Sequence, residues 1–582
     1  MERSDLAWWG SGILLVLFVA LDPLLTFPVF GSDTGEYYNL TSALLSFGHL
    51  PQGAAYAGWG FAYSEFPGLF EVSAATAGGA GIPVLTALQL VGPLIAAFAI
   101  VPLFLLFRRL VPNDTVAILG AVLGSLFMPR IYSVAHPAPL ALGEALVIAS
   151  LWMLVESRRD VRWYLPLTLT AGALVITHHL SSYFFVVSAL GLIVLTELVW
   201  PRRWSLRFPT RELVFLAAFL AGTLVYWFDY SQSFSAIVGT FHGVAITLPL
   251  AEGVALGGFA VLVALLWGRR RAFAPRKRVV KFPSDRSVLR DAAILLVGIY
   301  GGLALLVVHP LPGSTQTTTT AALVFFTPLL LLIVLTSGSR RLLAFARDGP
   351  LALTWIAAVG VSAFFAILLS STSPGVSQAI SPVRHAEYLV LPLGLIVAVC
   401  LGRLVGLARD RSGRPAAVAV ALGVVLLVGA NAAIAYPPPS VFGGFQEGLT
   451  NGDAAVWMWT GMAVPSAYAV ASDHRLSSMV FGFDGNPATW DSTPALFTGS
   501  SWSAAEAELV ASDAPHTSHH VAVSLVIVDG TMRSSGVALD PSALATPMSA
   551  NATAWFGGPP FVAIYENGGT TAYWVDLAAG PS

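Results

Sequence analysis

The sequence predicts a polytopic α-helical membrane protein of about 13 transmembrane helices, followed by a C-terminal soluble α+β domain. Three observations predict this class. Of the 582 residues, 56% are hydrophobic and only 11% are charged, against roughly 25% charged in a typical soluble domain. Apolar runs recur as far as Ala435, and the composition changes abruptly after that residue. This composition excludes a soluble enzyme, a disordered chain and a nucleic-acid-binding module.

A helix that crosses the bilayer needs roughly 20 mainly apolar residues. The runs that approach this length are 6–30, 83–107, 114–129, 138–155, 163–177, 182–200, 212–230, 245–268, 292–308, 321–337, 350–370, 387–402 and 415–435. The first run is too long for the apolar core of a signal peptide, so we interpret it as a retained helix.

The distribution of basic residues orients these helices, because Lys and Arg accumulate in cytoplasmic loops. If the N-terminus is in the cytoplasm, four of the 30 Lys and Arg residues fall on the outer side: Arg130, Arg384, Arg475 and Arg533. All 11 histidines fall on that outer side. The sequence therefore predicts a multi-pass protein of the plasma membrane, with an extracytoplasmic C-terminus and chemistry that faces outward.

The sequence divides into a transmembrane domain, residues 1–436, and an extracytoplasmic soluble domain, residues 437–582. Three prolines after Tyr436 form a stiff exit from the last helix. Strand-like runs follow at 524–530 and 559–568. Cys400 is the single cysteine, which excludes an intramolecular disulfide and a cysteine metal cluster.

The predicted first outer loop, from Gly31 to about Gly81, contains candidate catalytic carboxylates. Asp33 and Glu36 are three residues apart, so a helical turn places both on one face. Such a pair can hold a divalent cation, or one carboxylate can act as a general base. The alternative is a helix cap, with Ser32 or Asp33 as the N-cap. Glu65, later in the loop, is a candidate for binding or a turn residue.

Other candidates lie at the outer ends of later helices. Arg384 and His385 open the twelfth run, where an arginine can bind a lipid phosphate; the alternative is a helix pair between Arg384 and Glu387. The remaining candidates for substrate or phosphate binding are His178, His179, Arg130 and His136. Glu144 lies near the outer end of an apolar helix, where an ionisable group usually faces a cavity.

The first outer loop resembles that of the GT-C superfamily, membrane glycosyltransferases that use polyprenyl-phosphate-linked sugars. The parallel is with the catalytic subunit of oligosaccharyltransferase, whose first outer loop has an essential Asp, a Tyr-rich helix start and a later aromatic–Pro–Gly segment. Asp33, Tyr37, Tyr38 and Phe66-Pro67-Gly68 fit that outline.

The later motifs are degenerate. Tyr132-Ser133-Val134-Ala135 matches part of the second-loop motif, but Pro139 and Ala141 stand at the aligned metal positions. His136 and Glu144 are the residues there that can substitute. In the tail, Asp473-His474-Arg475 stands where the family has Trp-Trp-Asp-Tyr-Gly. Because that tryptophan pair is missing, the resemblance does not support recognition of an Asn-X-Ser/Thr acceptor.

The resemblance implies transfer of a sugar from a polyprenyl-phosphate-linked donor to an acceptor on the outer face, with Asp33 and Glu36 as catalytic residues. Expected partners are that donor, the acceptor and membrane lipids, without nucleic acid. A divalent cation, Mg²⁺ or Mn²⁺, is the candidate cofactor, although the second metal motif is absent. Its candidate ligands are Asp33, Glu36, His136 and Glu144. The alternatives are a non-catalytic GT-C relative that serves surface-glycan assembly and a lipid or glycan transporter.

Overall fold

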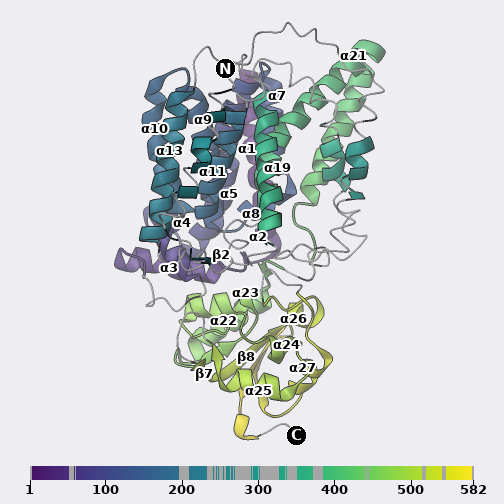
Figure 1. The fold of residues 1–582 in the computed structure, drawn as a ribbon. Helices are drawn as coiled ribbons and strands as arrows, with labels where there is room; N and C mark the ends of the chain where they lie inside the picture. The colour runs from purple at the N-terminus through teal and green to yellow at the C-terminus, as the bar shows by residue number, and fades with distance from the viewer. Residues whose placement is uncertain are drawn as a thin grey trace.

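The computed structural model describes residues 3–51, 58, 60–195, 209–231, 350–370, 384–439, 441, 444, 446–513, 520–539 and 545–579, with scattered residues between 240 and 336. The predicted spans 245–268, 292–308 and 321–337 lie largely outside these residues. Two regions are visible in Figure 1: a bundle of long helices that contains the N-terminus, and a smaller C-terminal region with strands.

The helical region contains the apolar helices that the sequence predicts. They are α1 (Arg3–Leu21), α2 (Pro23–Thr26), α5 (Val84–Phe98), α6 (Ile100–Leu110), α7 (Asp114–Leu126), α8 (Met128–Val134), α9 (Pro139–Ser157), α10 (Tyr164–Thr177), α11 (His179–Ala189), α13 (Thr210–Val225), α19 (Pro350–Ser370) and α21 (His385–Ala433). Within the described residues, five helices are long and apolar enough to cross a membrane, or up to six if the bent pair α7 and α8 is one span.

The two predicted spans 387–402 and 415–435 both lie in α21 (His385–Ala433), which consists of two helices joined by a kink at Gly413. Gly413 has φ of +81°, a conformation that glycine adopts without the penalty of a Cβ. The kink lies between the two apolar runs, so each run has a helix of its own, as the sequence predicts.

The predicted first loop is largely helical. It contains strand β1 (Val29–Phe30), α3 (Thr34–Phe47), the 3-10 helix η2 (Phe61–Glu65) and α4 (Gly68–Ala80). Helix α3 lies across the end of the bundle that faces the C-terminal region (Figure 1). This arrangement puts the residues at the start of α3 between the two regions.

The C-terminal region has a four-stranded sheet in the order β5-β8-β10-β9. Strands β5 (Ala469–Ala471) and β8 (Val523–Asp529) are parallel, whereas β10 (Thr570–Val575) pairs antiparallel with both β8 and β9 (Phe561–Glu566). The predicted strands 524–530 and 559–568 correspond to β8 and β9. The helices of this region are α22 (Asn451–Ala463), α23 (His474–Met479), α24 (Pro494–Thr498), α25 (Trp502–Val510), α26 (Gly530–Ser534) and α27 (Ala550–Trp555).

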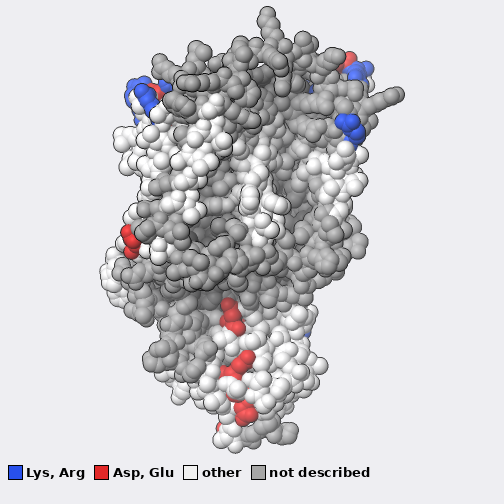
Figure 2. Space-filling model, in the orientation of Figure 1, with Lys and Arg blue, Asp and Glu red and all other residues white. Residues whose placement is uncertain are grey.

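Backbone and side-chain contacts join the two regions. Strand β1 pairs antiparallel with β4 (Gly448–Leu449), and the Ser32 amide donates to the Glu447 carboxylate at 2.7 Å. The Tyr38 ring stacks on Phe483 with centroids 3.8 Å apart. Figure 2 shows the visible basic residues at the end of the helical region far from the C-terminal region, which carries acidic residues on this face.

Two glycines allow α3 to approach the π-helical turn η6 (Val480–Asp484) closely. A Cβ on Gly482 would overlap the carbonyl oxygen of Gly35, which is a backbone atom and cannot rotate away. Gly482→Ala is therefore expected to separate α3 from η6 and to destabilise the fold by about 1–3 kcal/mol, as overpacking does. Thermal unfolding of the purified protein measures this loss. Gly79→Ala is the control, because a Cβ there meets nothing within 4 Å; equal melting of both variants would contradict the prediction.

Candidate active site at the junction of the two regions

Asp33 is the N-cap residue of α3, one of the two positions that the sequence predicts, but its side chain makes no capping hydrogen bond to that helix. Instead, the Tyr37 hydroxyl donates to Asp33 Oδ2 at 3.2 Å, and His474 Nε2 lies 2.9 Å from Asp33 Oδ1. The side chain of Asp33 keeps 26% of its surface exposed. The carboxylate is thus held by two partners and is still accessible to a ligand.

His474 bridges two carboxylates. It begins α23, and its Nδ1 lies 2.9 Å from Asp491 Oδ1, while Nε2 faces Asp33. Burial lowers the pKa of His474, but hydrogen bonds and charges of both carboxylates raise it more, so its pKa lies well above the ordinary value. Burial raises the pKa of Asp33, but His474, His136 and Tyr37 lower it below the usual value. An imidazolium between two carboxylates is the resulting charge state.

Tyr37, Tyr63 and Glu36 lie on the first loop with Asp33. The rings of Tyr37 and Tyr63 meet edge to face, 5.3 Å apart. Burial and the charge of Asp33 raise the pKa of Tyr63 to about 12, so its phenol stays protonated. Glu36 is buried, and its Oε1 accepts from the Gly60 amide at 2.7 Å. Glu36 therefore ties α3 to the segment that carries Tyr63.

Arg384 lies just before α21. Its Nη1 donates to Glu387 Oε1 at 2.8 Å and to Ser133 Oγ at 3.0 Å. The Ser133 hydroxyl also donates to Glu387. Its guanidinium and Asp33 both interact electrostatically with the Tyr63 hydroxyl. The helix pair that sequence offered as the alternative is present, and 38% of the Arg384 side chain remains exposed.

His136 and Glu65 have separate surroundings. His136 is close enough to Asp33 to lower its pKa, and its Nδ1 lies 3.3 Å from the Tyr132 carbonyl oxygen. Glu65 ends η2 and accepts a hydrogen bond from the Ser231 hydroxyl, while its carbonyl accepts from Tyr226. Glu65 thus joins the first loop to the end of α13, which fits the role of a structural turn residue.

Arg130 and Glu144 require a correction. The sequence places Arg130 on the outer surface and makes Glu144 a candidate metal ligand. The helix axis bends by 64° between α7 and α8, and this bend buries Arg130, whose Nε donates to Glu144 Oε1 at 2.8 Å. Their side chains are 1% and 2% exposed. The two form an internal ion pair, because each buried charge needs a partner.

The other histidines also have internal partners. His385 Nε2 lies 2.8 Å from Ser362 Oγ, and the His385 side chain is buried against α11 and α19, which leaves little of it accessible to a phosphate. His178 caps α11 through Ser181, whose hydroxyl also contacts Tyr388 at 2.8 Å. His179 lies against the ring of Phe66.

The expected cation has no preformed cluster in the part of the chain that the structure describes, where no three His, Cys, Asp or Glu side chains come together as a metal site. Of the candidate ligands, Glu144 is paired with Arg130, and Asp33 Oδ1 faces the His474 ring. The arrangement of these residues does not fit a metal ion.

No protein-family model and no curated protein matches this sequence. Solved structures do match. The apo oligosaccharyltransferase of Archaeoglobus fulgidus aligns with a TM-score of 0.57 and 13% identity, over 90% of this chain and 70% of that chain. The same enzyme tethered to an acceptor peptide with an NVT sequon aligns with a TM-score of 0.56 and 13% identity, over 99% of this chain and 74% of that chain. The chain has the GT-C fold.

At the level of the fold, the resemblance that the sequence indicated is confirmed, and the protein is a multi-pass membrane protein. ArnT from Cupriavidus metallidurans, bound to undecaprenyl phosphate, aligns with a lower TM-score of 0.44 and 14% identity, over the full length of both chains. The Archaeoglobus enzyme has also been crystallised with Zn and sulfate; that metal belongs to the archaeal protein.

Sequence reasoning did not select His474, Asp491 or Tyr63 as site residues. The Asp473-His474-Arg475 triplet was the available signal for His474, because it stands at the position of a family motif. Asp491 and Tyr63 have no comparable signal, since their positions depend on contacts between distant segments.

Proposed function

We propose that this protein is a glycosyltransferase that moves a sugar from a polyprenyl-phosphate-linked donor to an acceptor on the outer face of the plasma membrane. The observation that carries this proposal is the presence of an accessible carboxylate, Asp33, and a partly exposed arginine, Arg384, both near enough to Tyr63 for their charges to act on its hydroxyl. In this proposal, residues 437–582 form the extracytoplasmic domain and the N-terminus is cytoplasmic. The basic residues at the opposite end of the bundle support this orientation (Figure 2).

The proposed reaction is displacement at the anomeric carbon of the donor sugar. The acceptor hydroxyl gives its proton to Asp33 as its oxygen forms a bond to the anomeric carbon. The bond from that carbon to the phosphate oxygen breaks, and polyprenyl phosphate leaves with the electron pair. Asp33 then returns its proton to water. A carboxylate with a lowered pKa is ionised at neutral pH and so can accept a proton.

Arg384 is the proposed contact for the donor phosphate. A guanidinium has five N–H donors, and the contacts of Arg384 described above use one nitrogen, Nη1. Charge-assisted hydrogen bonds to phosphate are among the stronger ones in proteins. His136 and Glu36 are proposed to set the charge around Asp33. The proposed reaction is written without a divalent cation, because the described carboxylates and histidines do not come together as a metal site.

Arg384→Ala is expected to weaken the binding of polyprenyl phosphate by about 10- to 100-fold. The loss corresponds to a hydrogen bond to a charged group, worth about 1.5–3 kcal/mol. Titration of the detergent-solubilised protein with undecaprenyl phosphate, followed by native mass spectrometry, measures the change in Kd. Arg384→Lys should retain part of the affinity because it keeps the charge.

Arg533→Ala is the matched control, because Arg533 lies in the C-terminal region and donates to Thr571 and Tyr573. It should bind the lipid phosphate as the wild type does. If Arg384→Ala binds undecaprenyl phosphate as tightly as the wild type, or if neither binds it, the assignment of Arg384 is wrong.

A further inference from the structure

The His474 ring makes contacts on both sides that only a protonated imidazole can satisfy. Nε2 lies 2.9 Å from Asp33 Oδ1 and Nδ1 lies 2.9 Å from Asp491 Oδ1. Ionised carboxylates only accept hydrogen bonds, and neutral imidazole has a single N–H donor. Two such contacts therefore require both nitrogens to carry protons. The side chain of His474 is 5% exposed, so water does not replace either partner easily.

The backbone near His474 and Asp491 is fixed by hydrogen bonds and by packing. Asp473 caps α23 by accepting from the Leu476 amide, and the His474 amide donates to the Ala538 carbonyl. Asp491 follows Trp490, which has φ of +50°, a strained value for a bulky residue. The fully buried Trp490 ring packs against His474, 5.2 Å away. Strain of this kind persists only where the surrounding structure over-determines it.

We propose that His474 is a positioning residue for Asp33: anchored by Asp491, it fixes Oδ1 and places a positive charge against the Asp33 carboxylate. This inference rests on the proposed function. A carboxylate has about four lone-pair positions, and His474 and Tyr37 use two of them. The exposed part of Asp33 then offers a fixed direction to the acceptor hydroxyl. The raised pKa of His474 and the lowered pKa of Asp33 agree with this arrangement.

A positioning role does not require His474 to touch the donor. A substitution of His474 should therefore change the rate of transfer and not the affinity for the donor. His474→Gln keeps a neutral hydrogen-bond donor near Asp33 but removes the charge. Asp491→Asn keeps the shape of the anchor but removes its charge. Both variants should lower kcat, and His474→Ala should lower it by about 10²-fold, the cost of a misplaced group of about 1 Å. The Kd for undecaprenyl phosphate should not change.

A purely structural contact between the two regions would behave differently. Phe483→Leu is the matched control, because it removes the stacking of Phe483 on Tyr38 in the same interface without touching Asp33. If His474 were only a structural tie, both Phe483→Leu and His474→Gln would lower the melting temperature and leave kcat intact. The positioning role predicts that kcat falls in His474→Gln and Asp491→Asn, and not in Phe483→Leu.

The experiment measures kcat, KM, donor Kd and melting temperature for the full-length wild type, Asp33→Asn, His474→Gln, His474→Ala, Asp491→Asn and Phe483→Leu in proteoliposomes. Full kcat in folded His474→Gln and Asp491→Asn, with Asp33→Asn inactive, would overturn the inference and leave the proposed function standing. Equal transfer by the wild type and Asp33→Asn would overturn both the inference and the role of Asp33 as the base, whereas absence of transfer by the wild type would overturn the proposed function. If His474→Ala fails to fold, His474→Gln and Asp491→Asn still decide the result.

Discussion

Asp33→Asn is expected to lower the rate of sugar transfer by about 10²-fold or more, the lower end of a general-base contribution. Asparagine keeps the size of the side chain and can still contact Tyr37 and His474. It carries no negative charge, and its amide cannot take the acceptor proton at neutral pH. The protein should therefore fold and bind the donor but transfer slowly. Initial rates of release of polyprenyl phosphate in proteoliposomes measure this effect.

The control is Asp410→Asn, an exposed carboxylate on α21 that lies far along the helix from Arg384. It should transfer at the wild-type rate, because surface substitutions of this kind rarely disturb a protein. An Asp33→Asn protein with full activity would remove Asp33 from the chemistry, whatever its contacts.

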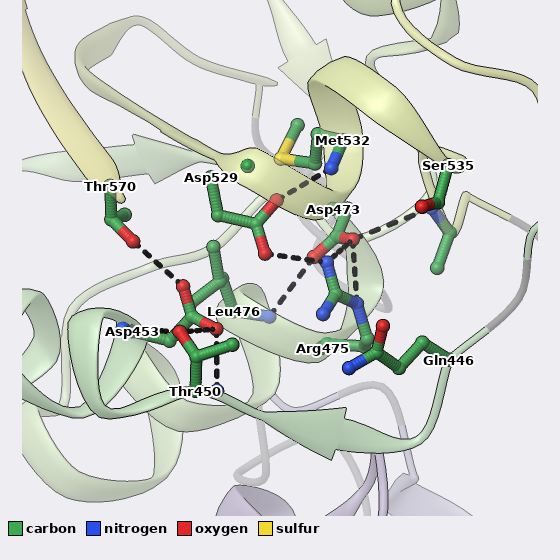
Figure 3. Close-up of polar contacts among 12 residues, drawn as sticks. Gln446, Thr450, Asp453, Asp473, Arg475, Leu476, Asp529, Met532, Ser535 and Thr570 are labelled. Atoms are coloured by element: carbon green, nitrogen blue, oxygen red, sulfur yellow. Dashed lines mark hydrogen bonds and ion pairs between the residues drawn. The ribbon is translucent and has the colours of Figure 1, made fainter. Parts of the chain in front are cut away.

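Arg475→Met is expected to destabilise the C-terminal region by about 3–5 kcal/mol, the cost of breaking a buried ion pair by removing one partner. Arg475 is fully buried and donates to Asp473 Oδ2 at 2.7 Å and to Asp529 Oδ2 at 3.0 Å. Figure 3 shows the guanidinium between these two carboxylates. Asp529 is the last residue of β8, and Asp473 lies two residues after β5, the strand parallel to β8. Methionine fills a similar volume but leaves both carboxylates without their shared counter-charge.

The same two aspartates also cap helices, so the loss of stability in Arg475→Met should extend to those helices. Asp473 accepts from the Leu476 amide at the start of α23, and Asp529 accepts from the Met532 amide at the start of α26. Because α23 carries His474, Arg475→Met should also loosen the contact with Asp33. Unfolding followed by fluorescence and limited proteolysis measures both effects.

Arg533→Met is the control for this substitution. Arg533 is an exposed arginine of the same region, so its loss should change stability by about 0.5 kcal/mol or less. If Arg475→Met unfolds at the same denaturant concentration as Arg533→Met, the ion pairs of Arg475 contribute little to the fold.

Features that depend on local sequence were predicted well. Apolar runs gave the position of α9 and α19 to within a few residues, and the strand-like runs gave β8 and β9. These elements follow from periodicity and hydropathy, which act over neighbouring residues. The sequence also selected Asp33 as a candidate from its position after the first helix, but it did not predict His474 as a partner of Asp33.

Features that depend on distant contacts were missed. Ser32 and Asp33 suggested a helix cap, but His474, 441 residues away in the sequence, takes the Asp33 side chain instead. Arg130 was expected on the outer face because it follows the third predicted span; the bend after α7 turns it inward to Glu144. A local pattern cannot specify which buried partner a charged side chain will meet, because that depends on the packing of several helices.

The most direct test of the account is a transfer assay with the full-length protein in proteoliposomes. The donor is a radiolabelled sugar linked to polyprenyl phosphate, and a membrane extract is the source of acceptor. The measured quantity is the release of free polyprenyl phosphate together with transfer of label to the acceptor fraction. The account predicts both for the wild type, and at least about 10²-fold less for Asp33→Asn. Equal turnover by the two proteins, or no turnover of any polyprenyl-linked sugar by the wild type, would contradict it.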